Sequence, residues 1–429
     1  MMNKTEALVE STRCLQCHDS PCQSACPANI YIPAFIRMIK SGNLAGAAEV
    51  IYRDNPLGGI CGYVCPTEEL CKKECTRRKV DMPVRIRELH QYATELYPLS
   101  SLSGLKKAQK AKGKKIAIIG SGPAGLACAM ELASNGYDVT IFEAKPHPGG
   151  ILRYGIPSHR LTIEFLEREL EDIKRMGVKI NCNSPVKNNG VDRLLSEGYS
   201  AVFIATGLGN PKRLNVPGAE LKNVLTATEF LRAAKNEDTK DIARMVKGKN
   251  IAIIGGGSVA MDVAVTARRF GAKRVYAICL ESLAELPAKK EDFALAVENF
   301  VTLKPHSQIT EIIGRRGAVA GVRGCEVEWI RPNLFVPSNA RPVPGTEFSL
   351  TVSAVIFAIG YAPDPQINKI CSTIKYDKNG RILTGKDGVS TADKRVFAGG
   401  DIVRGAGGTV VEAVRDGKKA AEKIMKTVK

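Results

Sequence analysis

The feature that most constrains the fold is a strand–glycine loop–helix pattern that occurs twice in the chain. The first copy is "KKIAIIGSGPAGLACAMELASNGYDVTIFE" (114–143) and the second is "KNIAIIGGGSVAMDVAVTARRFGAKRVYAICLE" (249–281). In each copy an apolar run ends at a glycine, a helical segment follows, and a second apolar run ends at an acid. Such units build parallel sheets with helices on both faces. The sequence therefore predicts an α/β protein with two Rossmann-like domains.

The first glycine loop has the spacing of a dinucleotide site. Its first glycine permits a tight turn, its second lets backbone approach a pyrophosphate, and its third lets the helix pack on the strand. The phosphates then lie at a helix N-terminus, where free N–H groups favour anions. A carboxylate that ends the second strand can accept hydrogen bonds from ribose hydroxyls. The predicted site residues are Gly120, Gly122, Pro123, Ala124, Gly125 and Glu143.

The second glycine loop predicts a nicotinamide dinucleotide site. Its second strand ends at Glu281, whose carboxylate would repel the 2′-phosphate of NADPH and bind the free 2′-hydroxyl of NADH. NAD(H) is therefore favoured over NADP(H), although a phosphate contact from Arg268 or Lys289 would contradict this preference. The predicted site residues are Gly255, Gly257, Ser258, Val259, Ala260 and Glu281.

Two such units in one chain suggest an FAD domain that is interrupted by an NAD(P) domain. The segments "AVFIATG" (201–207) and "AVIFAIG" (354–360) resemble the strands at which the chain passes between such domains. The segment 395–424 resembles the C-terminal FAD motif of this flavoprotein superfamily, and "HPGGILRYGIP" (147–157) resembles the segment over the isoalloxazine. The resemblance implies that Asp401 binds the ribityl chain and that a helix N-terminus lies near the flavin pyrimidine. The implied FAD residues are Gly150, Leu152, Gly400, Asp401, Thr409 and Val410.

Hydride transfer from nicotinamide to flavin needs stacking and proximity but no protein acid or base. No catalytic side chain is therefore predicted. Some related flavoproteins use a redox-active Cys-x-x-Cys beside the flavin, but the Cys-x-x-Cys-like spacings here lie outside both Rossmann units. The sequence thus disfavours a disulfide reductase.

Eight of the thirteen cysteines lie between Cys14 and Cys75. The first four have the spacing C-x2-C-x4-C-x3-C-P, and the last four have the spacing C-x3-C-P…C-x3-C. Structural zinc prefers paired C-x2–4-C knuckles, and only Cys14 with Cys17 is typical of one. Ferredoxin-type ligation uses three closely spaced cysteines followed by a Cys-Pro whose thiolate binds the other cluster. A flavin accepts two electrons as a hydride and releases them one at a time, and iron–sulfur clusters carry single electrons onward. Two [4Fe–4S] clusters are therefore predicted in preference to zinc.

The cysteine segments "RCLQCHDSPCQSACPA" and "DNPLGGICGYVCPTEELCKKEC", together with both Rossmann motifs, resemble the glutamate synthase small-subunit family over nearly the whole chain. Within that family they are most similar to the FAD and iron–sulfur subunits of bacterial NAD-dependent dihydropyrimidine dehydrogenases. The resemblance implies crossed ligation and leaves Cys61 as a core thiol. The implied ligands are Cys14, Cys17, Cys22 and Cys75 for one cluster, and Cys26, Cys65 and Cys71 for the other.

In this family the fourth ligand of the second cluster is a glutamine or a carboxylate just before an aromatic residue. This chain reads "VRIRELHQY" at that place, so the ligand position counted back from Tyr92 falls on His90. On a helix His90 shares an apolar row with Ile86 and Ala93, whereas Gln91 falls on a polar row. His90 is therefore the predicted ligand, with Gln91 as the alternative ligand and a buried, non-ligating histidine as a third interpretation. A neutral imidazole in place of a thiolate would raise the cluster potential.

The resemblance implies an NADH-oxidising subunit that passes electrons through FAD and two clusters to a partner subunit. The partner would carry FMN and iron–sulfur centres and reduce uracil or thymine to the 5,6-dihydropyrimidine. Two alternatives are the small subunit of NADPH-dependent glutamate synthase and a ferredoxin–NAD(P) reductase-type or bifurcating subunit. A redox-sensing or scaffold protein is disfavoured by the intact dinucleotide motifs.

The net charge of +18 does not require a nucleic-acid partner, because six lysines fall in one linker-like stretch, "KKAQKAKGKK" (106–115), with no aromatic-rich basic motif. The most apolar stretch has 15 residues and is short for a membrane span. Neither a membrane nor an export signal is predicted, and a cytoplasmic protein is expected. The predicted domains are a helical domain with two clusters (1–100), a linker (101–114), the FAD domain in two parts (115–212 and 360–429) and the NAD(P) domain (213–359).

Overall fold

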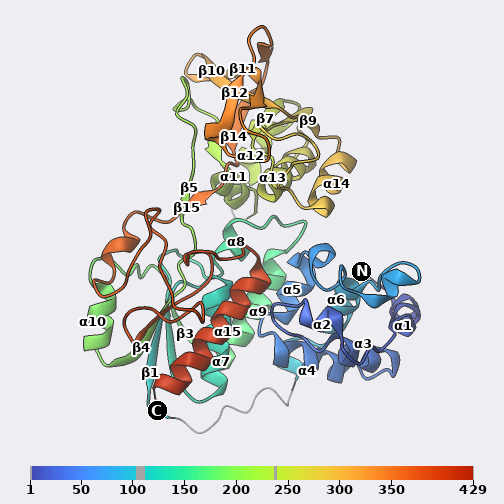
Figure 1. The fold of residues 1–429 in the computed structure, drawn as a ribbon, viewed down its shortest axis with the longest axis vertical. Helices are drawn as coiled ribbons and strands as arrows, with labels where there is room; N and C mark the ends of the chain where they lie inside the picture. The colour runs from blue at the N-terminus through green and yellow to red at the C-terminus, as the bar shows by residue number, and fades with distance from the viewer. Residues whose placement is uncertain (1, 103–111, 236–238, 429) are drawn as a thin grey trace. The chain divides into compact units, whose positions relative to one another are not determined.

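The computed structural model describes residues 2–102, 112–235 and 239–428, so most of the predicted linker 101–114 lies outside the described residues (Figure 1). The chain divides into two compact units. Unit 1 comprises Met1–Leu152, Arg160–Gly209 and Pro363–Lys429, and unit 2 comprises Arg153–His159 and Asn210–Ala362. Unit 2 is thus inserted into the chain of unit 1.

The N-terminal part of unit 1 is helical, with no strand among residues 2–102. Asn3 begins the first helix with a capping box to Glu6, and buried Phe35, Ile36 and Ile39 form the inner face of the third. The α-helices are α1 (Lys4–Thr12), α2 (Pro21–Ser24), α3 (Ile32–Lys40), α4 (Leu44–Asp54), α5 (Gly58–Val64) and α6 (Ile86–Leu96). Short 3₁₀ turns are η1 (Thr67–Glu69), η2 (Thr76–Lys79) and η3 (Leu99–Ser101).

The rest of unit 1 is a parallel five-stranded sheet with the order β16-β4-β1-β2-β3. Ile116 to Ile119 of β1 are buried, as expected for a strand that helices cover on both faces. The strands are β1 (Lys115–Ile119), β2 (Asp138–Phe142), β3 (Lys179–Asn181), β4 (Tyr199–Ile204) and β16 (Val396–Ala398). The helices are α7 (Pro123–Ser134), α8 (Ile151–Tyr154, at the boundary with unit 2), α9 (Ile163–Arg175), α10 (Gly190–Ser196) and α15 (Val410–Thr427), with the turn η6 (Ile367–Lys369).

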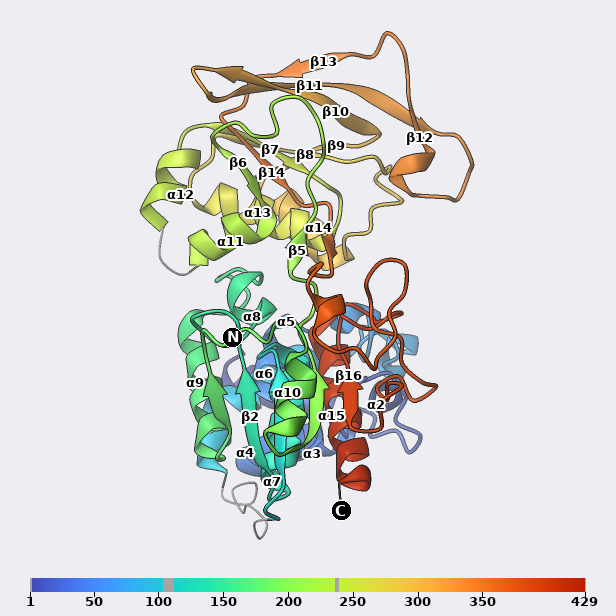
Figure 2. The ribbon, with the colours of Figure 1, turned by 90° about the vertical axis from the view of Figure 1, so that its left-hand side faces the viewer.

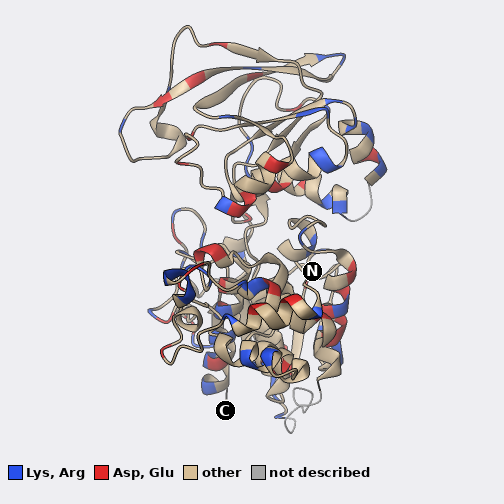
Figure 3. Ribbon diagram, turned by 90° about the vertical axis from the view of Figure 1, so that its right-hand side faces the viewer, with Lys and Arg blue, Asp and Glu red and all other residues tan. Residues whose placement is uncertain are grey.

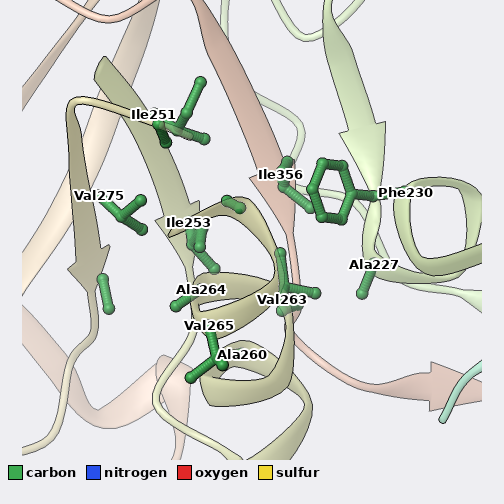
Figure 4. Close-up of a cluster of buried hydrophobic side chains, with 14 of the residues drawn as sticks. Ala227, Phe230, Ile251, Ile253, Ala260, Val263, Ala264, Val265, Val275 and Ile356 are labelled. Atoms are coloured by element: carbon green, nitrogen blue, oxygen red, sulfur yellow. The ribbon is translucent and has the colours of Figure 1, made fainter. Parts of the chain in front are cut away.

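Unit 2 contains a second parallel sheet with the order β6-β14-β7-β8-β9. Its core packs Phe230, Val263 and Ile356 against Ile251 and Ile253 (Figure 4). The strands are β6 (Val224–Thr226), β7 (Asn250–Ile254), β8 (Arg274–Ile278), β9 (Thr302–Lys304) and β14 (Ala354–Phe357). The helices are α11 (Ala227–Lys235), α12 (Thr239–Val246), α13 (Ser258–Arg269) and α14 (Lys290–Glu298).

Unit 2 also carries an antiparallel sheet that the motifs did not predict (Figure 2). Its strands are β10 (Ser307–Arg315), β11 (Ala318–Trp329), β12 (Ala340–Pro342) and β13 (Phe348–Leu350), with the turn η5 (Pro337–Asn339). The short strands β5 (Asn210–Pro211) and β15 (Tyr361–Ala362) pair antiparallel where the chain enters and leaves unit 2. The predicted fold class is confirmed: a helical N-terminal region precedes two nested Rossmann-like domains.

Candidate cofactor sites

The first candidate site is a cavity in the helical region that four cysteines line. Its empty volume is about 350 Å³, part of which opens to solvent, and apolar walls come from Ile32, Ile36 and Ile86. Gln16 and Ser20 have left-handed backbone conformations, which fold the loop after α1 around the cavity. The cysteines that line it are Cys14, Cys17, Cys22 and Cys75, the four that the resemblance assigned to one cluster.

The second candidate site is a cavity of about 370 Å³ next to the first, and Ile32 and Ile86 line both. Phe35 and Val411 contribute apolar walls to it. The side chains with metal-binding atoms are Cys26, Cys61, Cys65, Cys71 and His90. The structure therefore brings together the implied ligands of the second cluster and adds Cys61, which the resemblance had left as a core thiol.

The cysteines line cavities rather than meet at one point. In the described parts of the chain, no three His, Cys, Asp or Glu side chains group closely enough to hold a single metal ion. Burial, helped by repulsion from Cys14, raises the pKa of the Cys22 thiol to about 12, and burial raises the pKa of Cys71 further. Iron binds deprotonated thiolates, so binding of a cluster at such a site releases the thiol protons. The positive charge of iron then compensates the negative charge of the thiolates.

His90 on α6 is buried, and its Nε2 atom has no hydrogen-bond partner in the structure. The ring forms a hydrogen bond with the backbone of Gly58, but burial dominates and lowers the pKa of His90 to about 4. A metal-ligating histidine characteristically uses its other ring nitrogen in this way. The ring is therefore neutral at pH 7, with one nitrogen held by the backbone and Nε2 without a partner, and His90 is among the residues that line the second cavity. Gln91 does not line that cavity.

The first glycine loop has the close approaches that its sequence predicts. Gly120 has a φ of +102°, and a Cβ added there would lie 2.6 Å from the carbonyl oxygen of Ala205. A Cβ added to Gly125 would lie 2.0 Å from the carbonyl oxygen of Gly120, so the helix α7 can pack on β1 only with glycine there. Gly122 is the N-cap of α7, which leaves the first N–H groups of the helix for an anion.

Glu143 lies at the end of β2, but its carboxylate is already bonded to the glycine loop. Oε2 accepts hydrogen bonds from the backbone N–H (3.0 Å) and hydroxyl of Ser121, and Oε1 accepts one from the Lys145 N–H (2.9 Å). A carboxylate has about four acceptor positions, so a ribose hydroxyl can share it. Sequence reasoning did not include Ser121, although its place inside the glycine loop is the signal for such a contact.

The other implied FAD residues lie at turns and helix ends of unit 1. Gly150 has a φ of +52°, and an added Cβ would lie 2.8 Å from the Cα atom of Gly122, so the two glycine turns touch. Leu152 is fully buried, and the Gly400 N–H donates to Asp416 Oδ2 (3.1 Å). Burial raises the pKa of Asp401, which lies directly after Gly400.

Helix α15 links the implied FAD site to the second cysteine cavity. Thr409 is its N-cap and forms a capping box with Glu412, so the N-terminus of the helix is fixed, with Val410 in its first position. Val411, in the same first turn, lines the second cavity. Helix α15 also packs along α7, as Figure 1 shows. Sequence reasoning missed Val411 because no motif indicates what the inner side of that turn contacts.

A buried polar contact joins the helical region to helix α9 of the Rossmann-like part of unit 1. The Tyr52 hydroxyl donates to Glu169 Oε1 at 2.8 Å, and both side chains are buried. Burial raises the pKa of Glu169 to about 7, although the hydrogen bond from Tyr52 partly opposes the shift. Nearby, the Ser100 N–H donates to the buried Asp172 of α9 (3.0 Å). These contacts fix the helical region against the Rossmann-like part within unit 1.

The second glycine loop, in unit 2, repeats the geometry of the first. Gly255 has a φ of +136°, and an added Cβ would lie 2.4 Å from the carbonyl oxygen of Ala358. Gly257 is the N-cap of α13. The Lys289 N–H donates to Ser258 Oγ at 3.1 Å, which folds the segment after β8 back over the loop. Val259 and Ala260 follow Ser258 in the first turn of α13.

The residues that could select between NADH and NADPH have separate roles. Glu281 Oε2 lies 3.2 Å from the position of a Cβ added to Gly256, so its carboxylate stands at the glycine loop. Arg268 donates to the carbonyl oxygens of Ala272, Lys273 and Asn299, which fixes the C-terminal end of α13. The guanidinium that could have favoured a 2′-phosphate is therefore occupied by backbone carbonyls.

Two protein families match the sequence. Residues 1–99 match the family described as "Dihydroprymidine dehydrogenase domain II, 4Fe-4S cluster", and residues 114–417 match "Pyridine nucleotide-disulphide oxidoreductase". The boundary between the two matches falls in the predicted linker. No helix among the described residues is both long and apolar enough to cross a bilayer.

Curated relatives align over almost the whole chain. The NAD-dependent dihydropyrimidine dehydrogenase subunit PreT of Escherichia coli K12 is 38% identical over 97% of this chain and 93% of its own length. The glutamate synthase [NADPH] small chain of the same organism is 34% identical over 98% of this chain and 91% of its own length. The NADP(+)-dependent formate dehydrogenase subunit beta of Moorella thermoacetica is 37% identical over 94% of this chain, which spans 59% of that protein.

Solved structures support the fold of the nucleotide-binding part. Thioredoxin reductase of T. acidophilum has a TM-score of 0.55 at 19% identity and covers 73% of this chain and 98% of its own. FprA of Mycobacterium tuberculosis in complex with NADPH has a TM-score of 0.58 at 17% identity and covers 73% of this chain and 84% of its own. At such identities the similarity establishes the fold alone.

Proposed function

The chain belongs to the pyridine nucleotide-disulphide oxidoreductase family and, within it, to the FAD and iron–sulfur subunits related to dihydropyrimidine dehydrogenase, and on this premise we propose that it oxidises NADH and supplies a pyrimidine-reducing partner with electrons. It is an NAD(P)H-dependent flavin and iron–sulfur oxidoreductase subunit. The proposal specifies the nucleotide, two clusters, an FMN and iron–sulfur partner, and uracil or thymine as the final acceptor. When bound, FAD would accept a hydride and the clusters would pass single electrons onward.

The observation that carries the proposal is the pair of adjacent cysteine cavities, the second of which is lined by Val411 of helix α15. We assign Cys14, Cys17, Cys22 and Cys75 to a cluster in the first cavity, and Cys26, Cys65, Cys71 and His90 to a cluster in the second. The unpartnered Nε2 of His90 supports its place in this set. Because Val411 of α15 lines only the second cavity, we place the second cluster nearer the flavin and the first nearer the surface.

We assign NADH rather than NADPH to unit 2. The carboxylate of Glu281 stands at the glycine loop, and Arg268 is committed to backbone carbonyls. A 2′-phosphate in that place would meet a negative charge, whereas a ribose hydroxyl could donate to it. One relative, at 34% identity, is named for NADPH, so the rates with NADH and with NADPH should be measured side by side.

The experiment is a comparison of acceptors with the purified full-length chain that carries FAD and iron. NADH should reduce ferricyanide or a dye, while uracil stays unreduced by the chain alone. Affinity purification of the tagged chain from its own host should recover a flavin and iron–sulfur partner, and the mixture should then convert uracil to dihydrouracil. Uracil turnover by the chain alone would overturn the two-subunit proposal. Recovery of a glutamine-cleaving partner instead would favour the glutamate synthase alternative.

A further inference from the structure

We propose that the surface around the first cysteine cavity docks an electron-accepting protein whose own redox centre is ringed by acidic side chains. This surface, called the exit face below, is defined by Leu15, Arg78, Lys79, Val80 and Met82. The inference rests on the proposed function, because it assumes that electrons leave the chain through the first cluster. It adds where they leave and which kind of surface receives them.

The exit face is apolar at its centre. Leu15 lines the first cavity and is 46% exposed, while Val80 and Met82 are 68% and 71% exposed. Arg13 donates to the carboxylate of Asp81 and to the carbonyl oxygen of Met82, which holds this turn against the loop that carries Leu15. Large apolar side chains that lie exposed to solvent on one surface are typical of a protein–protein interface.

The rim of the exit face is basic. The segment 72–79, "KKECTRRK", has five basic residues and one acid, and the candidate ligand Cys75 lies in its middle. Lys72 pairs with Glu68, and Arg77 pairs with Asp81. Among the described residues the exposed Lys73, Arg78 and Lys79 make no ion pair. Figure 3 turns the side of the helical region toward the viewer and shows Lys and Arg on several of its segments.

Lys73, Arg78 and Lys79 carry positive charges that no ion pair among the described residues neutralises, within four residues of the candidate ligand Cys75, although the Arg78 guanidinium also donates to the Lys73 carbonyl oxygen. Such charges attract a partner with negative charges and speed its association. The chain as a whole, with a formal net charge of +18, favours the same kind of partner. An acidic redox protein is therefore the occupant that this surface fits. A membrane of anionic lipids would require a larger apolar face or a lipid anchor to hold the chain stably.

The position of the exit face also fits the order of the sites. The second cavity is lined by Val411 of α15 and by the buried residues Cys71 and His90. The first cavity shares Ile32 and Ile86 with it but is lined at its outer side by the exposed Leu15. Electron tunnelling slows steeply with distance, so a partner that docks over the first cavity has the shortest route.

The test uses an acidic plant-type [2Fe–2S] ferredoxin as the probe and the full-length chain with FAD and both clusters. The double variant R78E/K79E reverses the two charges without an ion pair that precede Val80 in the sequence. The control variant R315E/R316E makes the same change of charge at the exposed turn between β10 and β11 of unit 2. Stopped-flow absorbance would follow NADH-driven ferredoxin reduction, and bleaching near 450 nm would follow FAD reduction.

We expect R78E/K79E to slow ferredoxin reduction at least about tenfold at low salt and to flatten its salt dependence. FAD bleaching and the EPR signals of the clusters should match the parent, and the control should reduce ferredoxin as the parent does. A rate for R78E/K79E within twofold of the parent would overturn the proposal, as would an equal loss in the control. If R78E/K79E loses iron, Met82→Glu at the 71% exposed position provides the same test.

Two failures are distinguishable. If NADH does not bleach FAD or reduce the clusters in the parent chain, the proposed function fails. If FAD and clusters are reduced but charge reversal at the exit face leaves ferredoxin reduction unchanged, only the docking inference fails.

Discussion

His90 is the residue on which the assignment of the second cluster depends. Replacing it with alanine should remove a ligand, lower the iron content by about one cluster and abolish one of two EPR signals, because an open iron site loses its cluster readily. Cys61→Ala is the matched control, since Cys61 lines the same cavity. Iron analysis and EPR of both variants provide the measurement. Iron loss in Cys61→Ala with a normal His90→Ala protein would make Cys61 the ligand.

Glu281 should set the choice of nucleotide. Glu281→Ala removes the charge that opposes a 2′-phosphate, so the preference for NADH over NADPH, expressed as a ratio of kcat/KM values, should fall about tenfold, or about 1.4 kcal/mol. Steady-state reduction of ferricyanide measures both values. Glu298→Ala, an exposed loss of the same charge on α14, should leave the ratio unchanged. A parent that uses NADPH as well as NADH would refute the assignment.

Glu169 should make the stability of unit 1 depend on pH. Its pKa of about 7 in the folded chain lies above the ordinary value of 4.5, so the folded state binds a proton more tightly than the unfolded state does. Stability from this group is therefore complete below about pH 4.5 and is lost as pH rises through 7. Glu169→Gln should gain about 2–3 kcal/mol relative to the parent between pH 5 and pH 8. Unfolding in urea at both pH values tests this, and Glu164→Gln, exposed on the same helix, should show no such difference.

At the scale of elements, the close contact between α15 and α7 positions two helix N-termini that are both assigned to FAD. Gly417 permits this contact, because a Cβ there would lie 2.3 Å from the carbonyl oxygen of Ala124. Gly417→Ala should push the helices apart, destabilise unit 1 by about 1–3 kcal/mol and reduce the FAD that the purified chain retains. Lys419→Ala, on the exposed side of α15, should retain FAD as the parent does. Full FAD occupancy in Gly417→Ala would show that this spacing does not control the flavin site.

Elements with a repeated local pattern could be predicted from the sequence, and elements without one could not. The buried runs of β1 and β7 each end at a glycine loop that leads into a helix. Only the strand–loop–helix arrangement of a Rossmann-like unit satisfies this pattern. The antiparallel strands β10 to β13 lack such a motif, so their pairing depends on tertiary context. Tyr52 and Glu169 are 117 residues apart in sequence, and no local signal connects them. The grouping of the cysteines came from family resemblance, whereas the free Nε2 of His90 and the position of Val411 required the structure.

At the scale of the whole molecule, the nucleotide loop of unit 2 and the cysteine cavities of unit 1 belong to separate compact units. None of the implied FAD residues is a candidate cluster ligand, so removing iron by mild oxidation and chelation should leave FAD reduction by NADH intact, while reduction of ferredoxin stops. Absorbance at 450 nm and ferredoxin bleaching measure the two activities on one sample. Loss of FAD reduction together with the iron would indicate that the cluster region is needed to form the flavin site. Reconstitution with iron and sulfide should restore ferredoxin reduction and is the control.

The pairing of β5 with β15 has an evolutionary consequence. Asn210 and Ala362 are direct partners in this ladder, so the segment that forms most of the second nucleotide-binding unit begins and ends at one place in the fold. A segment whose two ends are adjacent can be replaced by another domain with little change to the rest of the protein. Recombination at this ladder could thus change the nucleotide specificity of a protein in this family and leave the cysteine-rich helical region unchanged. Named relatives that use NAD in one case and NADPH in another fit such a history.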